Sequence, residues 1–455
     1  MRRRPLRAVL LLVALALVAA PVGRPRAHAA DAGLVLEALR ILRARYVDSV
    51  EPTPLLNGAL AGVRAALSAA GVAAEVPELA SPGEAADAAF RARFEAAAAA
   101  ASGRLTRTAL TYAAIRGMTA TLRDSHTGFL TPEANRERQL RQRGQAGFTG
   151  AGIVLLERDG RFYVRDVIPD GPALRAGVQR LDRIARIDGI STLGLQVEQV
   201  AGSIRGPAGT AVTLVLDRPG RADPVTVSLV RAPIQVPAVF EARVLPGGVG
   251  YLHFYQFTAR SGREFRAALD RLLASGARAL VLDVRANVGG YVHELSAVLS
   301  ALLPAGRPIL RETSRGGRTR TVYTAGRPAL PPGLPVVVLV DDATASAAEL
   351  LAAALREHLR ARVVGTRTSG AVEASIVVDL SDGSALSVTV QRLSTGLGYR
   401  LEGVGVQPDL SIALTGADLD RGQDTQLLRA LAVAREGARP AAQPRSAVGG
   451  SGRTP

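Results

Sequence analysis

A serine stands where a continuous apolar run gives way to a helix-forming one. Val336–Val340 is apolar throughout, and Ser346 follows it just ahead of Ala347–Glu349. A hydroxyl at the first turn of a helix lies beside unpaired backbone N–H groups and the positive end of the helix dipole. That environment suits the nucleophile of an acyl transfer and its developing oxyanion. The spacing of Ser346 and Glu349 also fits a capping box that only starts a helix, and taken alone it favours the cap.

Two further stretches contain glycines at which the backbone can come close to a bound ligand. Leu282–Gly290 ends a predicted strand in the pair Gly289-Gly290, so its backbone can come close to a bound group. Leu401–Asp409 is a second such turn and carries Glu402 next to a glycine.

The side chains able to move a proton are few. The chain has no cysteine and no lysine, which excludes a thiol nucleophile, a lysine base and every cysteine-based metal site. Arginine stays protonated, so histidine is the natural base near neutral pH. Apart from His28, the histidines are His126 at the end of a predicted helix, His253 in a predicted strand, His293 after the glycine pair, and His358 late in the helix that follows Ser346.

Three kinds of element must position these groups. Residues 31–123 are Ala-rich and helical in period, and Thr106–Leu122 is their last predicted helix. From Gly147 short strands follow one another, and from Val236 to Glu436 strands alternate with helices, which indicates an α/β core with flanking helices. The strands predicted in the short-strand region are Gly152–Glu157, Phe162–Ile168, Asp182–Ile187, Val212–Leu216 and Val225–Val230.

Length and charge limit the function classes. The chain has 455 residues, 47% of them hydrophobic, which favours two or three globular domains over a disordered protein. The net charge of +16 is concentrated at the ends, because residues 1–29 hold six arginines and residues 437–455 hold three, with no acid in either. The remainder carries +7 and few aromatics for base stacking, so we expect no nucleic-acid partner.

The first 29 residues have the pattern of a secretory signal. Arg2, Arg3, Arg4 and Arg7 precede an apolar run at 8–20, and Ala27-His28-Ala29 fits the small-x-small cleavage rule. We expect an exported protein in the periplasm, cell envelope or extracellular space. An uncleaved signal that anchors the protein is the alternative.

The short-strand region resembles a PDZ domain. Gly171–Val178 followed by Asp182-Arg183-Ile184 matches that family's most recognisable run, with Leu181 where the family usually has glycine. Gly150, Ala151, Gly152 and Ile153 stand where the family's carboxylate-binding loop enters its peptide-binding strand. The resemblance implies that these four residues bind the C-terminus of a protein or peptide as an added strand.

Four motifs around this region resemble the C-terminal processing (tail-specific) serine peptidases. They are Tyr251–Phe257, Leu282–Gly290, Thr344–Glu349 and Leu401–Asp409, in the family's order over roughly residues 110–412. The resemblance implies that Ser346 is the nucleophile and that Ala347, with Gly289 or Gly290, forms the oxyanion hole. The family's usual base is a lysine, and its position here is Ala371.

The lysine-less tricorn-like branch of the same superfamily offers a different base. That branch uses a histidine in the segment that His126 occupies here, oriented by a glutamate near a turn like Gly405–Asp409. The resemblance implies a triad of Ser346, His126 and Glu402. His293 stays open as a rival base.

The prediction is an exported serine endopeptidase that acts near the C-termini of protein or peptide substrates, without metal or cofactor. The alternative is a catalytically inactive peptide-binding scaffold of the cell envelope, because Ala371 replaces the lysine. A membrane-associated adaptor and the oligomeric state are left open. The predicted bounds are a signal peptide at 1–29, a helical region at 30–144, a PDZ domain at 145–232, an α/β peptidase core at 233–436 and a disordered tail at 437–455.

Overall fold

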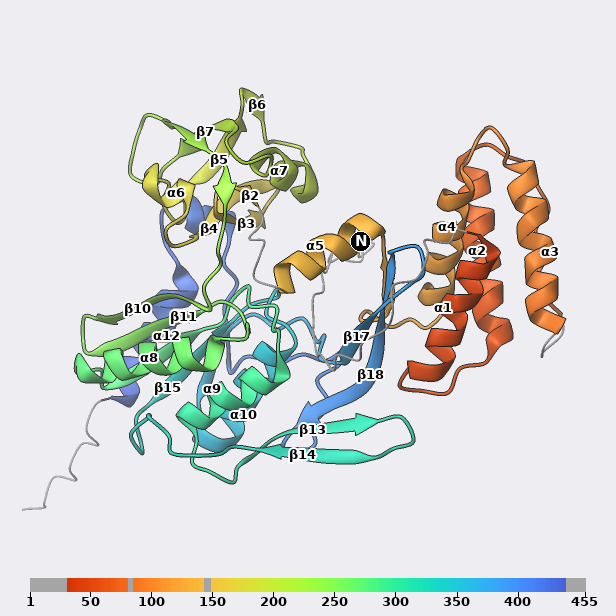
Figure 1. Ribbon diagram of the computed structural model, residues 1–455. Helices are drawn as coiled ribbons and strands as arrows, with labels where there is room; N and C mark the ends of the chain where they lie inside the picture. The colour runs from red at the N-terminus through yellow and green to blue at the C-terminus, as the bar shows by residue number, and fades with distance from the viewer. Residues whose placement is uncertain (1–30, 81–84, 143–148, 439–455) are drawn as a thin grey trace, which may run out of the picture.

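The computed structural model describes residues 31–80, 85–142 and 149–438. Figure 1 shows an N-terminal group of helices beside β17 (Ala374–Asp379) and β18 (Ala385–Thr395), a small β-rich module, and a larger α/β body. The predicted signal peptide and residues 439–455 of the predicted tail lie outside the described residues. Gly437, the first residue predicted as tail, still belongs to helix α12.

The N-terminal group consists of α1 (Ala32–Arg45), α2 (Pro52–Ala69), α3 (Ala85–Ala100) and α4 (Arg107–Ala120). Glycines let α2 and α4 approach closely, since a Cβ on Gly62 would lie 2.1 Å from the carbonyl oxygen of Ala113. The apolar core of this group includes Leu386 and Val388, which belong to strand β18 of the five-stranded sheet. Burial of these shared side chains attaches the helices to the sheet described below.

The β-rich module is an antiparallel sheet in the order β3-β4-β5-β7-β8, with β6 paired to β5. Phe162, Ile184 and Leu214 lie in its own apolar core. Strand β3 is at the edge of the described sheet, and the short pair β2–β9 joins the module's two ends. Its elements are β2 (Thr149–Gly150), β3 (Ile153–Arg158), β4 (Arg161–Val167), α6 (Pro172–Arg175), β5 (Arg183–Ile187), β6 (Ile190–Ser191), α7 (Val197–Ile204), β7 (Ala211–Asp217), β8 (Val225–Val230) and β9 (Ala232–Pro233).

A six-stranded sheet forms the centre of the body, in the order β10-β11-β12-β15-β16-β19, and only β10 is antiparallel to its neighbour. Alternate residues of its strands face α8, α9 and α10 on one side and α12 on the other. Covering on both faces explains why β12 and β15 are buried throughout. The elements are β10 (Val239–Leu245), β11 (Val249–Phe254), α8 (Ser261–Ala274), β12 (Ala279–Asp283), α9 (Val292–Leu302), β15 (Val336–Val340), α10 (Ala347–Leu359), β16 (Arg362–Gly365), β19 (Leu410–Ser411), α11 (Gly416–Asp420) and α12 (Thr425–Gly437).

A second sheet of five strands lies between this body and the helices (Figure 1). Its order is β1-β18-β13-β14, with β17 also paired to β18. The last residues of strand β18, from Gln391 to Thr395, pair with β13. The elements are β1 (Gly128–Leu130), α5 (Pro132–Gln142), β13 (Pro308–Ser314), β14 (Thr319–Tyr323), β17 (Ala374–Asp379) and β18 (Ala385–Thr395).

The predicted fold class, an α/β core with a small β-rich domain and N-terminal helices, agrees with this architecture. None of the helices in the described ranges is both long and apolar enough to span a membrane.

Candidate active site

Ser346 occupies a strained turn between a buried strand and a helix. It follows β15 and immediately precedes α10, with φ 56° and ψ −124°. A non-glycine residue at positive φ costs on the order of 1–3 kcal/mol and persists where the surrounding structure holds it. A sharp strand-to-helix turn of this kind presents a serine hydroxyl for nucleophilic attack. The residue is 3% exposed.

Glu349 joins the start of α10 to the segment 368–371. Its carboxylate accepts hydrogen bonds from the N–H groups of Ser346 (3.0 Å), Gly370 (2.8 Å) and Ala371 (3.0 Å). Burial raises the pKa of Glu349, while these hydrogen bonds and one from Thr368 act to lower it. The glutamate half of the predicted capping box is therefore present, and it also fixes the loop beside the serine.

Ala371, the position of the family's lysine, is adjacent to the serine. The N–H of Ser346 donates to the carbonyl oxygen of Ala371 at 2.8 Å, and Ala371 is 3% exposed. The methyl group cannot titrate, so this position supplies no base.

The glycine pair packs against the same turn. Gly289 has φ +86°, and a Cβ built on it would lie 2.7 Å from Cβ of Ser346 and 2.8 Å from the nitrogen of Ala347. Ala347 is the first residue of α10, and its N–H has no acceptor among the described residues. The N–H of Gly289 is donated to Oδ1 of Asn287 at 2.9 Å. Of the predicted oxyanion-hole donors, Ala347 is thus unpaired and Gly289 is not.

Gly290 and Asn287 fix this loop from the other side. A Cβ on Gly290 would lie 2.1 Å from the carbonyl oxygen of Phe257. Asn287 is fully buried; its Nδ2 donates to the carbonyl of Phe254, and its own carbonyl accepts the N–H of Ala345. These contacts join the glycine pair to the residue that precedes Ser346.

His126 is buried in the connection between α4 and β1. The sequence placed it at the end of a helix, but α4 ends at Ala120 and His126 lies just before β1. The reason is that the N–H of His126 donates to the Asp124 side chain, while its carbonyl accepts from Ser387 of β18. Pairing with β18 therefore fixes its position, rather than the helix.

The His126 ring faces Glu402. Nε2 lies 3.4 Å from Oε2 of Glu402, an ion-pair approach longer than a well-formed hydrogen bond. Both ring nitrogens are buried and have no hydrogen-bond partner in the described part of the chain, Ser346 included. Since Nε2 faces Glu402, Nδ1 is the nitrogen available to a proton donor.

Glu402 is held by the segment that follows Ala371. Its Oε2 accepts the N–H groups of Val372 (2.7 Å) and Glu373 (3.3 Å). Burial acts to raise the pKa of Glu402, but the contact with His126 and these two N–H groups outweigh it and lower the pKa. Residues 371–373 thus contact Ser346 at one end and Glu402 at the other, which brings the predicted serine, histidine and glutamate to one short stretch of chain.

The other histidines lie in different surroundings. The His293 side chain is 70% exposed, with Nε2 3.6 Å from Glu294. His253 is buried in β11 with Nδ1 3.5 Å from Asp166, and Nε2 of His358 is 2.8 Å from the carbonyl oxygen of Pro308. None of these contacts involves Ser346.

The predicted peptide-binding residues lie at the start of edge strand β3. Gly150 ends β2, Gly152 has φ +81°, and Ile153 begins β3. The carbonyl of Ala151 accepts the N–H of Ala173 at the start of α6. Leu181 keeps a left-handed turn, with φ 71°, at the position where the PDZ family usually has glycine.

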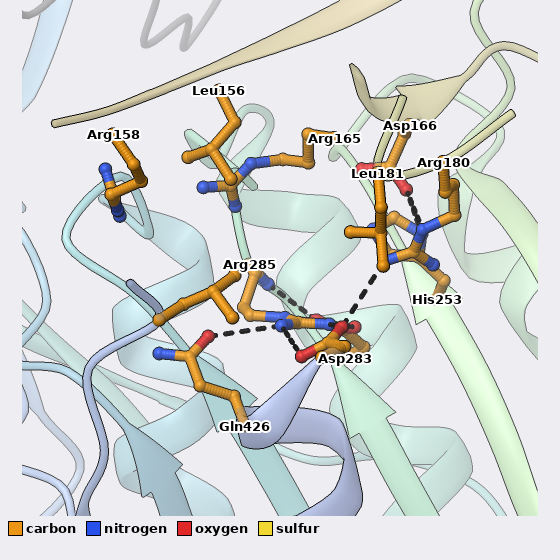
Figure 2. A pocket seen from close by; sticks show the side chains of 12 residues that line it. Leu156, Arg158, Arg165, Asp166, Arg180, Leu181, His253, Asp283, Arg285 and Gln426 are labelled. Atoms are coloured by element: carbon orange, nitrogen blue, oxygen red, sulfur yellow. Dashed lines mark hydrogen bonds and ion pairs between the residues drawn. The ribbon is translucent and has the colours of Figure 1, made fainter. Parts of the chain in front are cut away.

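A charged cavity separates the β-rich module from the body, away from Ser346. Figure 2 shows Arg285 beside Asp283 and Gln426, and Arg180 beside Asp166. Arg285 also donates to Asp424, and Arg165 of β4 contacts Asp341, which follows β15. Of these ion pairs, the one between Arg165 and Asp341 links the module to the body.

Sequence reasoning missed two residues of the site, Asn287 and Glu373. Each is a polar residue inside an otherwise apolar or small-residue run, at 286–290 and 371–378. A buried polar side chain must find partners, so that pattern was the available signal.

The chain is similar in sequence to known peptidases. The family model described as "Peptidase family S41" matches residues 248–412, and that described as "PDZ domain" matches residues 163–218. The carboxy-terminal-processing protease of Bartonella bacilliformis is 31% identical over 320 residues, which cover 69% of this chain and 72% of that protein. The chloroplastic C-terminal processing peptidase of Tetradesmus obliquus is 36% identical over 327 residues, covering 68% and 69%.

The fold is likewise similar to that of a solved peptidase. The photosystem II D1 C-terminal processing protease matches with a TM-score of 0.53 and 29% identity, over 85% of this chain and 94% of that one. The predictions of the family and of a serine-type hydrolase are confirmed. The chain belongs to the C-terminal processing serine peptidases of peptidase family S41.

Proposed function

We propose that this peptidase cleaves proteins or peptides near their C-termini with Ser346 as nucleophile, His126 as base and Glu402 as the residue that orients the imidazole. The observation that carries the proposal is the joint placement of Ser346 and the His126–Glu402 pair against residues 371–373. The names of the matched relatives support the C-terminal preference.

The chemistry follows from the free ring nitrogen. Oγ of Ser346 attacks the scissile carbonyl while its proton passes to Nδ1 of His126, because Nε2 faces Glu402. The N–H of Ala347 stabilises the oxyanion together with a glycine N–H, and we assign that second donor to Gly290 because the N–H of Gly289 is donated to Asn287. The imidazolium then protonates the leaving amine, and a water attacks the acyl-enzyme with His126 again as base, which restores Ser346.

Substrate capture is assigned to the PDZ domain. The edge position of β3 supports addition of a peptide strand, and the loop Gly150–Ile153 would hold the terminal carboxylate. We take 30–144, 145–232 and 233–436 as the helical, PDZ and peptidase parts. Equal affinity for free and amidated peptides would contradict this role.

We further propose that the chain is exported, on the signal pattern in residues 1–29. The chloroplastic relative supports action in an organelle or compartment outside the cytosol. Fractionation of cells that express the full chain, with and without residues 1–29, tests this point.

A fluorophosphonate probe tests the nucleophile, since it labels only an activated serine. The wild type should be labelled and Ser346→Ala should not, with casein cleavage lost in parallel. An unlabelled, inactive wild type would favour the scaffold alternative, which Ala371 in the lysine position supports. Cleavage that persists in Ser346→Ala would assign the nucleophile elsewhere.

Substitution of the histidines tests the base. His126→Ala should lower turnover by roughly 10²–10⁴-fold, the usual contribution of a general base. Glu402→Gln should cost less because Glu402 acts through the His126 ring and does not itself take the proton. His293→Ala, exposed and matched in chemistry, serves as the control and should stay near wild type. The assignment is wrong if His293→Ala is the crippling change.

A further inference from the structure

A second carboxyl group is buried beside the His126–Glu402 pair. The Glu373 side chain is 7% exposed, and its Oε2 is buried without a hydrogen-bond partner in the described residues. Its Oε1 lies 3.7 Å from Nη2 of Arg400, a side chain that is itself 64% exposed. A buried carboxyl with one unpaired oxygen is costly to keep, so its position calls for an explanation.

Glu373 is joined directly to the site by its backbone. Its N–H donates to Oε2 of Glu402, the same oxygen that faces His126. Two residues earlier, the carbonyl of Ala371 accepts the N–H of Ser346. The backbone of Glu373 therefore belongs to the stretch that holds the nucleophile and the glutamate together.

Charged side chains from several neighbouring segments act on the Glu373 carboxyl group. Burial and the charge of Glu402 raise the pKa of Glu373 to about 7, while Arg392 of β18, Arg400 and His126 act to lower it. Charge interactions are mutual. Because the positive charge of protonated His126 stabilises the Glu373 carboxylate, that carboxylate stabilises the imidazolium of His126 in return.

We propose that Glu373 is a positioning residue of the Ser346 site: its carboxylate acts through His126, sharing with Glu402 the stabilisation of the imidazolium that forms when His126 takes the serine proton. This inference rests on the proposed function. His126 is cationic only after that proton transfer, so the added stabilisation applies to the transition state more than to the ground state. No atom of Glu373 need contact the substrate.

The pH profile of kcat/KM tests the inference. Removal of a negative charge near the imidazole makes protonation of the ring less favourable, so Glu373→Gln should move the acid limb to lower pH by up to about one unit. The plateau should fall by about three- to tenfold, because the imidazolium loses part of its stabilisation. The ¹³C or ¹⁵N titration of the His126 ring, recorded in Ser346→Ala to prevent self-cleavage, should shift downward in the same direction.

Glu357→Gln is the matched control. Glu357 is also a partly buried glutamate of raised pKa with an unpaired Oε2, but its neighbours are Thr395, Leu397 and His358 rather than His126. Its removal should leave the acid limb and the His126 titration unchanged. A merely structural role for Glu373 would lower activity without moving either.

Arg400→Gln keeps the inference testable if Glu373→Gln does not fold. Its side chain is exposed, so the substitution leaves the core unchanged, and loss of the Arg400 charge makes ionisation of Glu373 harder. The imidazole then has less negative charge beside it, so the acid limb should move to lower pH, as in Glu373→Gln. An unmoved limb in Arg400→Gln, or in a folded Glu373→Gln, overturns the inference.

The outcomes separate this inference from the proposed function. If Ser346→Ala and His126→Ala are inactive while Glu373→Gln matches Glu357→Gln, only the role of Glu373 fails. If His126→Ala stays active, the proposed triad fails first. If Glu373→Gln is as inactive as Ser346→Ala while His126→Ala is active, Glu373 is itself the base and the positioning role is overturned.

Discussion

At the scale of single residues, the backbone conformation of Ser346 allows a prediction about stability that its side chain alone does not. Its φ of 56° is a conformation that L-residues avoid and glycine adopts freely. The structure keeps a serine there, which is expected where the hydroxyl has a function that outweighs the strain.

Ser346→Gly should therefore be inactive yet more stable than Ser346→Ala, by about 1 kcal/mol, because only the glycine relieves the strain. Urea unfolding of the two inactive variants measures the difference without self-cleavage. Equal stability, or a less stable glycine variant, would mean that the turn is not strained as described.

At the scale of elements, the sequence predicts a strand whose residues form one continuous apolar run. It misses a strand that exists only because it pairs with another strand. The apolar run at Val336–Val340 is strand β15 as predicted, since a buried strand needs nothing else to be recognised. Strand β1 is three residues long and exists because it pairs with β18, which no local pattern reveals. His126 was assigned to a helix end for the same reason.

The candidate site divides in the same way. Ser346, the glycine pair and Glu402 were recognisable because each lies in a motif with its own turn residues. Glu373 was not, because what distinguishes it is burial beside Glu402, a contact between segments that periodicity cannot predict.

The glycine-pair loop gives the prediction at this scale. Gly289→Ala should abolish probe labelling, because its Cβ would lie 2.7 Å from Cβ of Ser346 and displace the nucleophile turn. Gly276→Ala is the control: its φ is +82°, close to the +86° of Gly289, but a Cβ there meets nothing within 4 Å. The control should lose about 1 kcal/mol of stability and keep normal labelling. Labelling lost in both variants would point to general destabilisation instead.

At the scale of the whole molecule, a buried ion pair ties the PDZ module to the catalytic turn. Arg165 of β4 contacts Asp341, and their side chains are 11% and 2% exposed. Asp341 also accepts the N–H groups of Ala286 (3.0 Å) and Ala343 (3.1 Å), so it anchors the glycine-pair loop and the loop that leads to Ser346. A change in the module can therefore reach the site through one carboxylate.

Arg165→Met should destabilise the chain by about 3–5 kcal/mol near neutral pH and reduce labelling of Ser346, because it leaves a buried carboxylate without its cation. Burial acts to raise the pKa of Asp341, but Arg165 and the N–H of Ala286 outweigh it and lower the pKa. A lowered carboxyl pKa contributes stability above the ordinary value near 4 and loses it as pH falls through the folded-state pKa. In the variant the folded-state pKa of Asp341 rises, so the stability gap to wild type should be large at pH 7 and shrink towards pH 4, where the carboxyl can take a proton.

Urea unfolding at both pH values, in a Ser346→Ala background, measures the gap in stability between Arg165→Met and the protein that keeps Arg165. Arg266→Met, which breaks the exposed pair with Asp270, is the control and should change stability by less than about 1 kcal/mol. A gap of the same size at both pH values would assign the loss to packing of the arginine rather than to its charge.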